Sequence, residues 1–420
     1  MFELDSTQKQ AVELCCDVSH RIVSVTGSAG TGKTSIMRLA YAALSDAGYN
    51  VVLCAPTGKA AKRIQEATDI PARTIHRLLE YPRPGDRNPK TGKPLRPGEP
   101  QRHRMNPLDF DVVLADEYAM VSTDVHRNLV DALPRGGVIR MFGDVNQLPP
   151  IEQDRRLKNA PSPFKTMLEK FDSVVLTTIH RQDEGSGIVS NGALILKGQL
   201  PKRLDDFALQ ITDSPVMDLR ALAVEKLDTG VDYSSTENQI ISPTNKGWVG
   251  TAELNNMLQR VFRHNDLSKG FTLPRHEWDA YKRYTIAPGD KVIWTQNNYD
   301  LEVFNGETGI VTDITEFDEV VIDFGDRMLT IPPVVETTNR WGKLVQYDPR
   351  MDIDLAYCVT THKAQGSEYM NVVYVLNRSS SWIQSRPNLY TAVTRARKHV
   401  HIISDQHSLS MSVSRRNAAI

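Results

Sequence analysis

Residues 27–34 read Gly-Ser-Ala-Gly-Thr-Gly-Lys-Thr, and this run constrains the fold more than any other part of the 420-residue chain. It follows an apolar, β-branched stretch at residues 22–26 and precedes residues 33–46, where apolar side chains recur at helical spacing. Glycines at a strand-to-helix turn let backbone N–H groups surround a phosphate, and the helix dipole strengthens the attraction. The run therefore predicts a phosphate-binding loop at the carboxyl edge of a sheet.

Within this loop the side chains have separate expected roles. Lys33 is expected to reach the β and γ phosphates of ATP, and the Thr34 hydroxyl is expected to ligate Mg²⁺. The remaining residues expected to contact the nucleotide through the loop backbone are Gly27, Ala29, Gly30, Thr31 and Gly32.

Two adjacent carboxylates, Asp116 and Glu117, end a second apolar run at residues 111–116. By itself such a pair is as compatible with a solvated turn as with a site. Behind a phosphate-binding loop it favours hydrolysis over kinase chemistry, because one acid can hold Mg²⁺ and the other can polarise water. Asp116 is the expected metal ligand and Glu117 the expected base.

Apolar runs alternate with helix-like segments through most of the chain. They lie at residues 22–26, 50–55, 111–116 and 137–143, and again at 239–242, 371–376 and 399–404. Near-continuous apolar strands separated by helices are typical of parallel sheets covered on both faces. The pattern predicts an α/β protein with two such sheets and a boundary near residues 180–200.

Two stretches interrupt this rhythm. Residues 81–107 are rich in proline, glycine and basic side chains, which predicts either a disordered loop or a protruding hairpin. Residues 286–348 alternate strand signals with turn pairs such as Asn305-Gly306, which predicts a small antiparallel insertion.

Charge and cysteine content exclude some classes of protein. The chain has 50 Lys and Arg against 51 Asp and Glu, a net charge of −1, which excludes a uniformly basic coat but permits a local basic groove. Its four cysteines lack metal-binding spacing. The polar start is unlike a signal peptide, and no apolar run reaches the roughly 18 residues of a membrane span. A cytoplasmic protein, of a bacterium or a phage-infected cell, is expected.

A series of further motifs resembles superfamily 1 helicases, and most closely the RecD/Dda branch called superfamily 1B. The motifs begin with Gln8 and the segments APTGKAA (55–61), TIHRLL (74–79), GDVNQLPP (143–150) and TTIHRQ (177–182). They continue with GDKVIWTQNNY (289–299) and FNGE (304–307), and end with TTHKAQGSE (360–368) and LYTAVTRAR (389–397). The resemblance covers residues 4–403.

This resemblance implies a fold and an activity. It implies two RecA-like domains, residues 1–180 and 181–420, with a duplex-splitting pin at about 81–107 and an SH3-like barrel at about 299–348. It also implies an ATP-dependent DNA helicase that moves 5′ to 3′ on single-stranded DNA and unwinds duplexes as a cleft between the domains closes. A monomer is expected, acting on single strands and duplex junctions, with single-strand-binding, replication or recombination proteins as candidate partners.

The resemblance also assigns site residues. Gln8 would read adenine, Gln147 would touch the γ-phosphate, and the expected arginine fingers are Arg181 and Arg395. Gly366 and Glu368 would lie at the nucleotide. The residues expected to contact DNA are Thr57, Lys59, His76, Asn298, Thr361 and His362.

Several alternatives remain open on the residues themselves. His76 and His362 are as compatible with structural roles as with stacking on bases. Trp294, Tyr299 and Phe304 are candidate stacking platforms, although aromatic residues on strands are more often core. A translocase or RNA remodeller that does not separate strands would carry the same motifs, and a non-catalytic nucleic-acid-binding subunit is disfavoured by the complete set of ATP-site residues.

Overall fold

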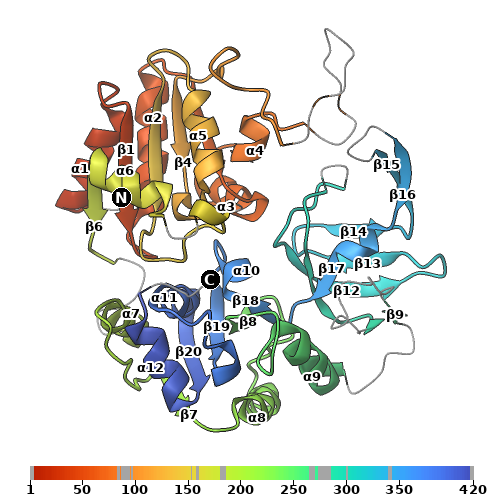
Figure 1. The fold of residues 1–420 in the computed structure, drawn as a ribbon. Helices are drawn as coiled ribbons and strands as arrows, with labels where there is room; N and C mark the ends of the chain where they lie inside the picture. Colours follow the sequence, from red (N-terminus) through yellow and green to blue (C-terminus); the bar gives the residue numbers. More distant parts are fainter. Residues whose placement is uncertain are drawn as a thin grey trace. The chain divides into compact units, whose positions relative to one another are not determined.

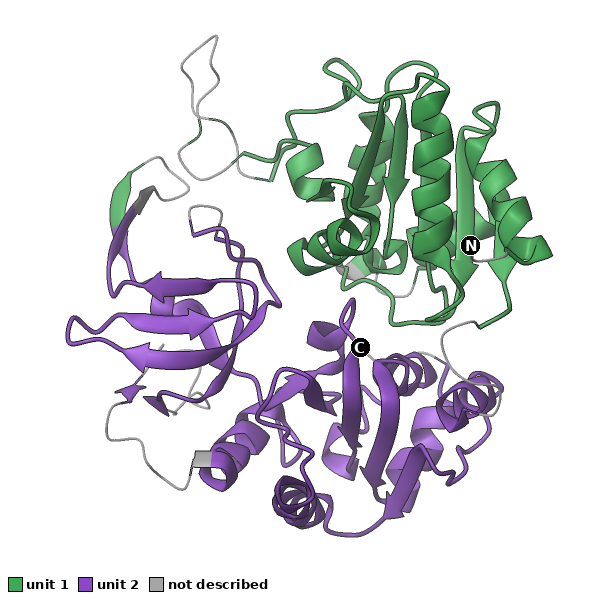
Figure 2. Cartoon of the chain, turned by 180° about the vertical axis from the view of Figure 1, so that it is seen from behind, with its two compact units in different colours: residues 1–183, 337–345 green, residues 184–336, 346–420 purple. Residues whose placement is uncertain are grey.

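The computed structural model describes residues 4–82, 86, 95, 98–152, 154–157, 160–179, 186–263, 270–272, 285–298, 301–338 and 343–416. The chain forms two compact units (Figures 1 and 2). The first comprises residues 1–183 with 337–345, and the second comprises residues 184–336 with 346–420. Each unit has its own parallel sheet.

The first unit is a six-stranded parallel sheet in the order β3-β2-β4-β5-β1-β6. Its strands are β1 (Ile22–Gly27), β2 (Val51–Ala55), β3 (Ala72–Thr74), β4 (Val112–Ala115), β5 (Val138–Gly143) and β6 (Asp172–Leu176). Its helices are α1 (Ser6–Cys16), α2 (Lys33–Asp46), α3 (Gly58–Thr68), α4 (Ile75–Leu78), α5 (Thr123–Asp131) and α6 (Pro163–Lys170), with 3-10 turns η1 (Tyr118–Met120) and η2 (Arg155–Leu157).

Helices cover both faces of this sheet, as the apolar strands predict. Buried side chains of α1, α2 and α3 pack on one face, including Ile36, Met37 and Ile64. Those of α4, α5 and α6 pack on the other, including Leu129 and Phe164. The four central strands are buried at every position. The edge strands β3 and β6 were not predicted, because both carry exposed positions and lack a continuous apolar run.

The second unit combines a parallel sheet, in the order β18-β8-β19-β20-β7, with an antiparallel sheet in the order β14-β13-β12-β11-β17. Its helices are α7 (Gly187–Leu196), α8 (Pro215–Asp228), α9 (Thr251–Arg263), α10 (Thr361–Ala364), α11 (Arg386–Val393) and α12 (Gln406–Ser414), with 3-10 turns η3 (Pro349–Asp352) and η4 (Arg378–Ser380). The parallel strands are β7 (Phe207–Ile211), β8 (Asn238–Ser242), β18 (Cys358–Thr360), β19 (Tyr369–Val375) and β20 (Ala396–Ser404). The other strands are β9 (Phe271–Thr272), β10 (Thr285–Ile286), β11 (Lys291–Trp294), β12 (Thr308–Ile314), β13 (Val320–Asp323), β14 (Met328–Ile331), β15 (Val335–Thr338), β16 (Leu344–Tyr347) and β17 (Ile353–Leu355).

The antiparallel sheet extends beyond residues 299–348, the insertion that the resemblance implies. Strand β11 lies before that range but within residues 286–348, which the alternating pattern predicts, and it pairs with β17, which lies after both ranges. The sheet therefore spans residues 291–355. Strand β17 has only three residues, too few to produce a recognisable alternating pattern.

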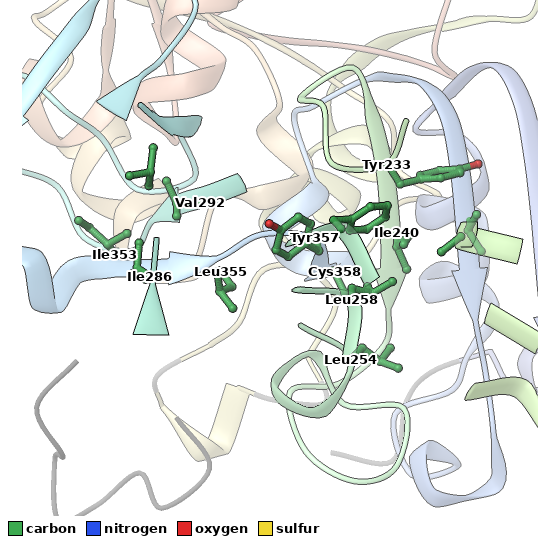
Figure 3. Packing of buried hydrophobic residues seen from close by; sticks show 14 of the residues in the cluster. Tyr233, Ile240, Leu254, Leu258, Ile286, Val292, Ile353, Leu355, Tyr357 and Cys358 are labelled. Carbon is green, nitrogen blue, oxygen red and sulfur yellow. The ribbon is translucent and has the colours of Figure 1, made fainter. Parts of the chain in front are cut away.

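Helix α9 joins the two sheets of this unit through a shared core (Figure 3). Leu254 and Leu258 of α9 belong to a buried cluster with Ile240 of the parallel sheet, and the same cluster includes Val292 and Ile353 of the antiparallel sheet.

A buried polar group lies in the same region. The Asp290 carboxylate accepts hydrogen bonds from the Tyr357 hydroxyl (2.6 Å), Gln259 Nε2 (2.6 Å) and the Ala287 amide (2.8 Å). Because a buried carboxylate is costly unless it is satisfied, these bonds make the joint between the sheets specific.

Trp294 is part of this core, with only 1% of its surface exposed. Its burial confirms the more common case of an aromatic residue on a strand, a place in the core, and excludes the stacking alternative, because an interior side chain cannot reach a base. Phe304 is half-buried, and Tyr299 lies outside the described residues.

Candidate functional site

The phosphate-binding loop runs from the end of β1 to the first turn of α2, as predicted. Gly30 and Gly32 have φ of 83° and 86°, which favours glycine. A Cβ on Gly27 would lie 2.5 Å from Thr31 Oγ1 and 2.9 Å from Leu176 Cβ, and one on Gly32 would lie 2.5 Å from Gln8 Nε2. The glycines are thus required both by backbone conformation and by close packing.

Lys33 folds back over this loop. Its Nζ donates hydrogen bonds to the carbonyls of Gly27 (2.7 Å) and Ser28 (2.9 Å), and the Thr31 hydroxyl also donates to Ser28 (2.9 Å). Hydrogen bonds between an ammonium group and phosphate oxygens are stronger than those to neutral carbonyls. An arriving phosphate would therefore compete well for Lys33.

Asp116 and Glu117 follow β4, two strands away from β1 in the sheet. Asp116 is 9% exposed, and its Oδ1 accepts a hydrogen bond from the Glu117 amide (2.8 Å). Burial and the neighbouring Glu117 carboxylate raise the pKa of Asp116, while the charge of Lys33 acts in the opposite direction. Asp116 therefore lies near enough to the phosphate-binding loop for the charge of Lys33 to affect its pKa.

Glu117 adopts a left-handed backbone conformation, with φ of 50° and ψ of 37°. Such a conformation costs a non-glycine residue about 1–3 kcal/mol and persists where its surroundings impose it. Here the next residue, Tyr118, is fully buried, and the Glu117 carbonyl accepts from the Met120 amide (3.0 Å). These surroundings keep Glu117 in the left-handed conformation, where its side chain is half-exposed beside Asp116.

Gln8 contacts the phosphate-binding loop from α1. Its Nε2 donates to the Thr31 carbonyl (3.1 Å), and its Oε1 accepts from the Asp5 amide (3.1 Å) in a capping box. The expected adenine reader is therefore placed at the loop by the geometry of a helix N-terminus.

Arg140 fixes the opposite end of α1 and was not recognised as a functional candidate from the sequence. It is fully buried on β5, and its guanidinium donates to the carbonyls of Cys15 (2.7 Å), Asp17 (2.8 Å) and His20 (2.9 Å). The signal available in the sequence was an arginine inside an otherwise apolar run. We assign Arg140 as a positioning residue for α1.

Gln147 lies just past β5, where the resemblance expects a γ-phosphate contact. It is 6% exposed, and its Oε1 is buried without a hydrogen-bond partner in the described part of the chain. The Thr26 hydroxyl of β1 accepts from the Val145 amide (3.2 Å), which ties this turn to the strand that carries the phosphate-binding loop. A buried Oε1 without a partner, on a turn tied to the strand before the phosphate-binding loop, is compatible with a hydrogen bond to a bound ligand.

Arg395 belongs to the second unit, between α11 and β20. It is 2% exposed, and its guanidinium donates to the carbonyls of Thr391 (3.1 Å) and Ser367 (3.1 Å) and to the Thr394 hydroxyl (3.3 Å). All three acceptors are neutral. A buried guanidinium that lacks a carboxylate in the described structure retains its capacity to stabilise an anion.

Gly366 and Glu368 lie on the segment that precedes β19. Gly366 has φ of 70°, and the Glu368 carboxylate accepts from Arg397 Nε (3.1 Å) and Nη2 (3.0 Å). Their expected contact with the nucleotide is not tested by this geometry, and it stays a prediction.

The expected strand contacts of the first unit lie at two helix starts. Thr57 caps α3 by accepting from the Ala60 amide (3.2 Å), and Lys59 is half-buried on the first turn. His76 is exposed on α4, and its ring lies 4.8 Å from that of Tyr81. These positions are compatible with phosphate or base contacts.

The expected contacts of the second unit differ in their exposure. The Thr361 side chain is fully buried, and its hydroxyl donates to Asn388 Oδ1 (2.7 Å). The hydroxyl is thus committed in the interior, and the expected contact of Thr361 with a strand stays a prediction. His362 is half-buried, and burial lowers its pKa, which favours a neutral ring.

Asn298 forms the turn that follows β11. Its backbone exchanges hydrogen bonds with Val303 (2.8 and 3.0 Å), and its Oδ1 accepts from the Leu301 amide (3.0 Å). This geometry gives the residue a structural role in the turn, and its expected DNA contact stays a prediction.

Two expected elements lie wholly or partly outside the described residues. Arg181 is not described, so its role as an arginine finger stays a prediction. Of residues 81–107, the described parts include Arg102, which pairs with Glu80 (2.8 Å) and Asp109 (2.7 Å). These ion pairs fix the returning end of the insertion to the first unit.

The first unit has donors that suit Mg²⁺. Thr34 and Asp116 offer a hydroxyl and a carboxylate, the hard oxygen ligands that this ion prefers. No cluster of three or more His, Cys, Asp or Glu side chains able to hold a metal occurs in the described ranges. A bound Mg²⁺ would accordingly use few protein ligands together with nucleotide phosphates and water.

The fold and these sites define a class, that of P-loop nucleotide hydrolases with two parallel-sheet units. Three family descriptions match the chain: "AAA domain" over residues 3–210, "ATP-dependent RecD-like DNA helicase SH3 domain" over residues 254–324, and "UvrD-like helicase C-terminal domain" over residues 355–403. None of the helices in the described ranges is long and apolar enough to cross a membrane.

Curated relatives point to one branch of this class. The chain is 30% identical over 414 residues to the ATP-dependent RecD2 DNA helicase of Deinococcus radiodurans, covering 98% of this chain and 51% of that protein. It is 25% identical to the RecBCD enzyme subunit RecD of Mycobacterium tuberculosis, covering 97% of this chain and 71% of that subunit. The chain thus spans about half the length of the Deinococcus relative.

A solved structure supports the fold. The Pif1 helicase from Bacteroides, in complex with ADP-AlF3 and single-stranded DNA, matches with a TM-score of 0.61 and 21% identity, covering 98% of this chain and 94% of that one. This match shows the fold. The RecD-like SH3 domain and the RecD relatives support a superfamily 1B helicase of the RecD type.

Proposed function

We propose that the protein is an ATP-dependent DNA helicase that moves 5′ to 3′ along single-stranded DNA and unwinds duplexes. Two buried features support the proposal. In the first unit Asp116 lies near enough to the phosphate-binding loop for the charge of Lys33 to lower its pKa, and in the second unit Arg395 is buried among neutral acceptors. The 5′-to-3′ direction is supported only by the resemblance to superfamily 1B.

Each residue has a role in this mechanism. The backbone amides of residues 27–34 and the Lys33 ammonium would bind the β and γ phosphates, and Gln8 would receive the adenine. Thr34 and Asp116 would hold Mg²⁺, which supplies charge neutralisation on the phosphates when bound. Glu117, held beside Asp116 by its strained backbone, would polarise the attacking water.

The remaining groups would respond to the γ-phosphate. Gln147 would direct its unpartnered Oε1 toward the attacking water or toward a donor at the phosphate site, and Arg395 would stabilise charge on the transferring phosphoryl group. If ATP binds more tightly when Arg395 of the second unit reaches it, binding favours a closed arrangement and hydrolysis releases it. Alternation of this kind would move a strand held by both units.

The partners follow from the same proposal. Single-stranded DNA and duplex junctions are the expected substrates, and cytoplasmic repair, recombination or replication is the expected setting. The names of the relatives, a RecD2 DNA helicase and a RecBCD subunit, support these expectations.

The test compares ATP hydrolysis with and without single-stranded DNA or RNA, followed by unwinding of duplexes with 5′ or 3′ tails. We expect stimulation by DNA and unwinding from 5′ tails. Lys33→Ala should abolish hydrolysis while leaving weak, salt-sensitive strand binding, and Ser35→Ala, an exposed neighbour on α2, is the matched control. If neither DNA nor RNA stimulates ATP hydrolysis, the proposal is rejected. Preferential unwinding of duplexes with 3′ tails would reject the 5′-to-3′ polarity.

A further inference from the structure

Trp248 is exposed to an unusual degree for its residue type. It has 77% of its surface accessible, whereas Trp294 in the same unit has 1%. Burying a tryptophan is strongly favourable, so an outward-facing one on a folded unit is often part of a binding surface.

The loop that carries Trp248 is rigid. It connects β8 to α9, and its backbone is closed by hydrogen bonds from the Gly250 amide to the Gly247 carbonyl (2.8 Å) and from the Thr251 amide to the Thr244 carbonyl (3.1 Å). Val249, the next residue, is fully buried and anchors the turn in the core. Because the backbone is already ordered, binding a ligand at Trp248 costs the loop little conformational entropy.

A cavity of about 290 Å³ lies beside the same loop. Asn245 and Lys246 of the loop line it, together with Thr251 on the first turn of α9. The Thr251 hydroxyl donates to Asn245 Oδ1 (3.0 Å), which holds this wall in place. The start of a 13-residue helix and an exposed lysine together favour an anionic ligand.

The opposite wall carries a charge pair. Lys363 Nζ lies 3.5 Å from Asp354 Oδ2, and both residues line the cavity. The single carboxylate at the cavity is thus matched by Lys363, while Lys246 adds a further positive charge. The lining mixes polar residues with apolar ones such as Ile293, Leu355 and Val359, and two lysines against one carboxylate leave it with a net positive charge.

A second exposed tryptophan lies on a loop that touches the first. A Cβ on Gly247 would be 3.1 Å from Ser379 Oγ, so the loops after β8 and β19 are in contact. The β19 loop carries Trp382, which is 49% exposed. Strands β8 and β19 are parallel neighbours, so both loops lie at the carboxyl edge of the sheet, where α/β proteins bind ligands.

We propose that Trp248 is a stacking platform for a base of single-stranded DNA, and that Lys246 and the start of α9 hold the adjoining phosphate at the cavity. The inference rests on the proposed function, since it specifies how that activity grips its strand. Aromatic faces beside cations bind single strands without reading sequence, because every base has a π face. A protein partner would not require the cationic cavity.

The test measures binding of fluorescein-labelled oligo(dT) by anisotropy, with the full chain at several salt concentrations. Trp248→Ala should weaken binding by about 5- to 150-fold, because stacking on one aromatic contributes about 1–3 kcal/mol per base. Trp248→Phe should restore most of the affinity. Phe317→Ala, which removes an aromatic side chain that is 70% exposed in the turn between β12 and β13, is the matched control and should bind as the wild type does.

Two further readouts separate stacking from charge. Lys246→Ala should reduce the slope of log affinity against log salt by about 0.7, the value for one phosphate contact, while Trp248→Ala should leave that slope unchanged. On an oligonucleotide that contains abasic sites in place of bases, wild type and Trp248→Ala should bind equally.

The outcomes are distinguishable. Equal affinity of wild type and Trp248→Ala for oligo(dT), or an equal loss on the abasic strand, would overturn the platform. A wild-type protein that fails to bind any single strand would instead reject the proposed function. Circular dichroism of Trp248→Ala should match that of the wild type, which shows that the variant is folded.

Discussion

Replacing Arg395 by methionine separates a structural from a catalytic role of the same side chain. Arg395 is 2% exposed and donates to three neutral acceptors. Methionine fills a similar volume without a charge. If the arginine serves the fold alone, its removal lowers the free energy of unfolding and leaves kcat unchanged. If it serves ATP hydrolysis, its removal lowers kcat.

The magnitudes can be estimated from these contacts. Three hydrogen bonds from a charged donor contribute about 1.5–3 kcal/mol each, and burying the charge opposes this by several kcal/mol. The two effects largely cancel, so we expect Arg395→Met to change the free energy of unfolding by less than about 3 kcal/mol. Loss of an arginine finger lowers kcat by about 10³- to 10⁵-fold, equivalent to about 4–7 kcal/mol.

The assay is DNA-stimulated ATP hydrolysis under saturating nucleotide, with calorimetry and equilibrium binding of ATP alongside. Arg395→Lys should remain strongly impaired, because a lysine lacks the planar fork. Lys398→Met, an exposed position on the following strand β20, is the control and should hydrolyse ATP normally. A folded Arg395→Met protein with kcat within tenfold of the wild type would refute the reasoning.

Three further predictions concern other parts of the chain. Arg140→Met should destabilise the first unit by about 1–3 kcal/mol and raise the KM for ATP, because carbonyls at the end of α1 lose their donor; circular dichroism measures the first effect, and an unchanged KM would contradict the positioning role. Burial lowers the pKa of His126 below its ordinary 6.5, so the stability that the neutral ring contributes is complete above pH 6.5 and is lost as the pH falls from 6.5 toward the lower pKa of the folded state. Urea titrations at pH 7.5 and 5.5 should show that the free energy of unfolding falls less in His126→Gln than in the wild type. An equal fall in both proteins would exclude His126 as the titrating group. Deleting residues 83–104 should abolish unwinding and spare DNA-stimulated hydrolysis, and normal unwinding would reject the pin.

The chemistry of His126 follows from its neighbour. Burial raises the pKa of Tyr118 well above its usual range, so the hydroxyl keeps its proton, and it shares a hydrogen bond with His126 Nδ1 (3.0 Å). The tautomer of the His126 ring decides which of the two groups donates. Burial alone lowers the pKa of His126 and favours its neutral form.

Much of the architecture could be predicted because local patterns carry it. Fully buried parallel strands require continuous apolar runs, and the predicted strands at residues 22–26, 50–55, 111–116 and 137–143 correspond to β1, β2, β4 and β5. Edge strands β3 and β6 were missed since solvent on one side relaxes that requirement. The antiparallel sheet was found, but its closing strand β17 was too short to be recognised.

Residue roles were harder to predict where burial decides them. Trp294 and Trp248 are the same residue type in neighbouring segments, yet one lies in the core and the other faces solvent. Thr361 belongs to a recognisable motif, but its hydroxyl is committed to Asn388 in the interior. No local pattern distinguishes these cases, because they depend on which distant element packs against each side chain.

The sequence by itself determined the chemistry of this protein: a phosphate-binding loop, a pair of carboxylates after an apolar strand, and the ordered motifs of a helicase family. Such chemistry is local, since a tight glycine turn and a strand end are specified by a few consecutive residues. Only the tertiary structure decided how those groups are held. Arg140 reaches across about 120 residues to clamp α1, Glu117 keeps a strained backbone, and Trp248 is presented outward, because long-range packing sets burial and backbone strain.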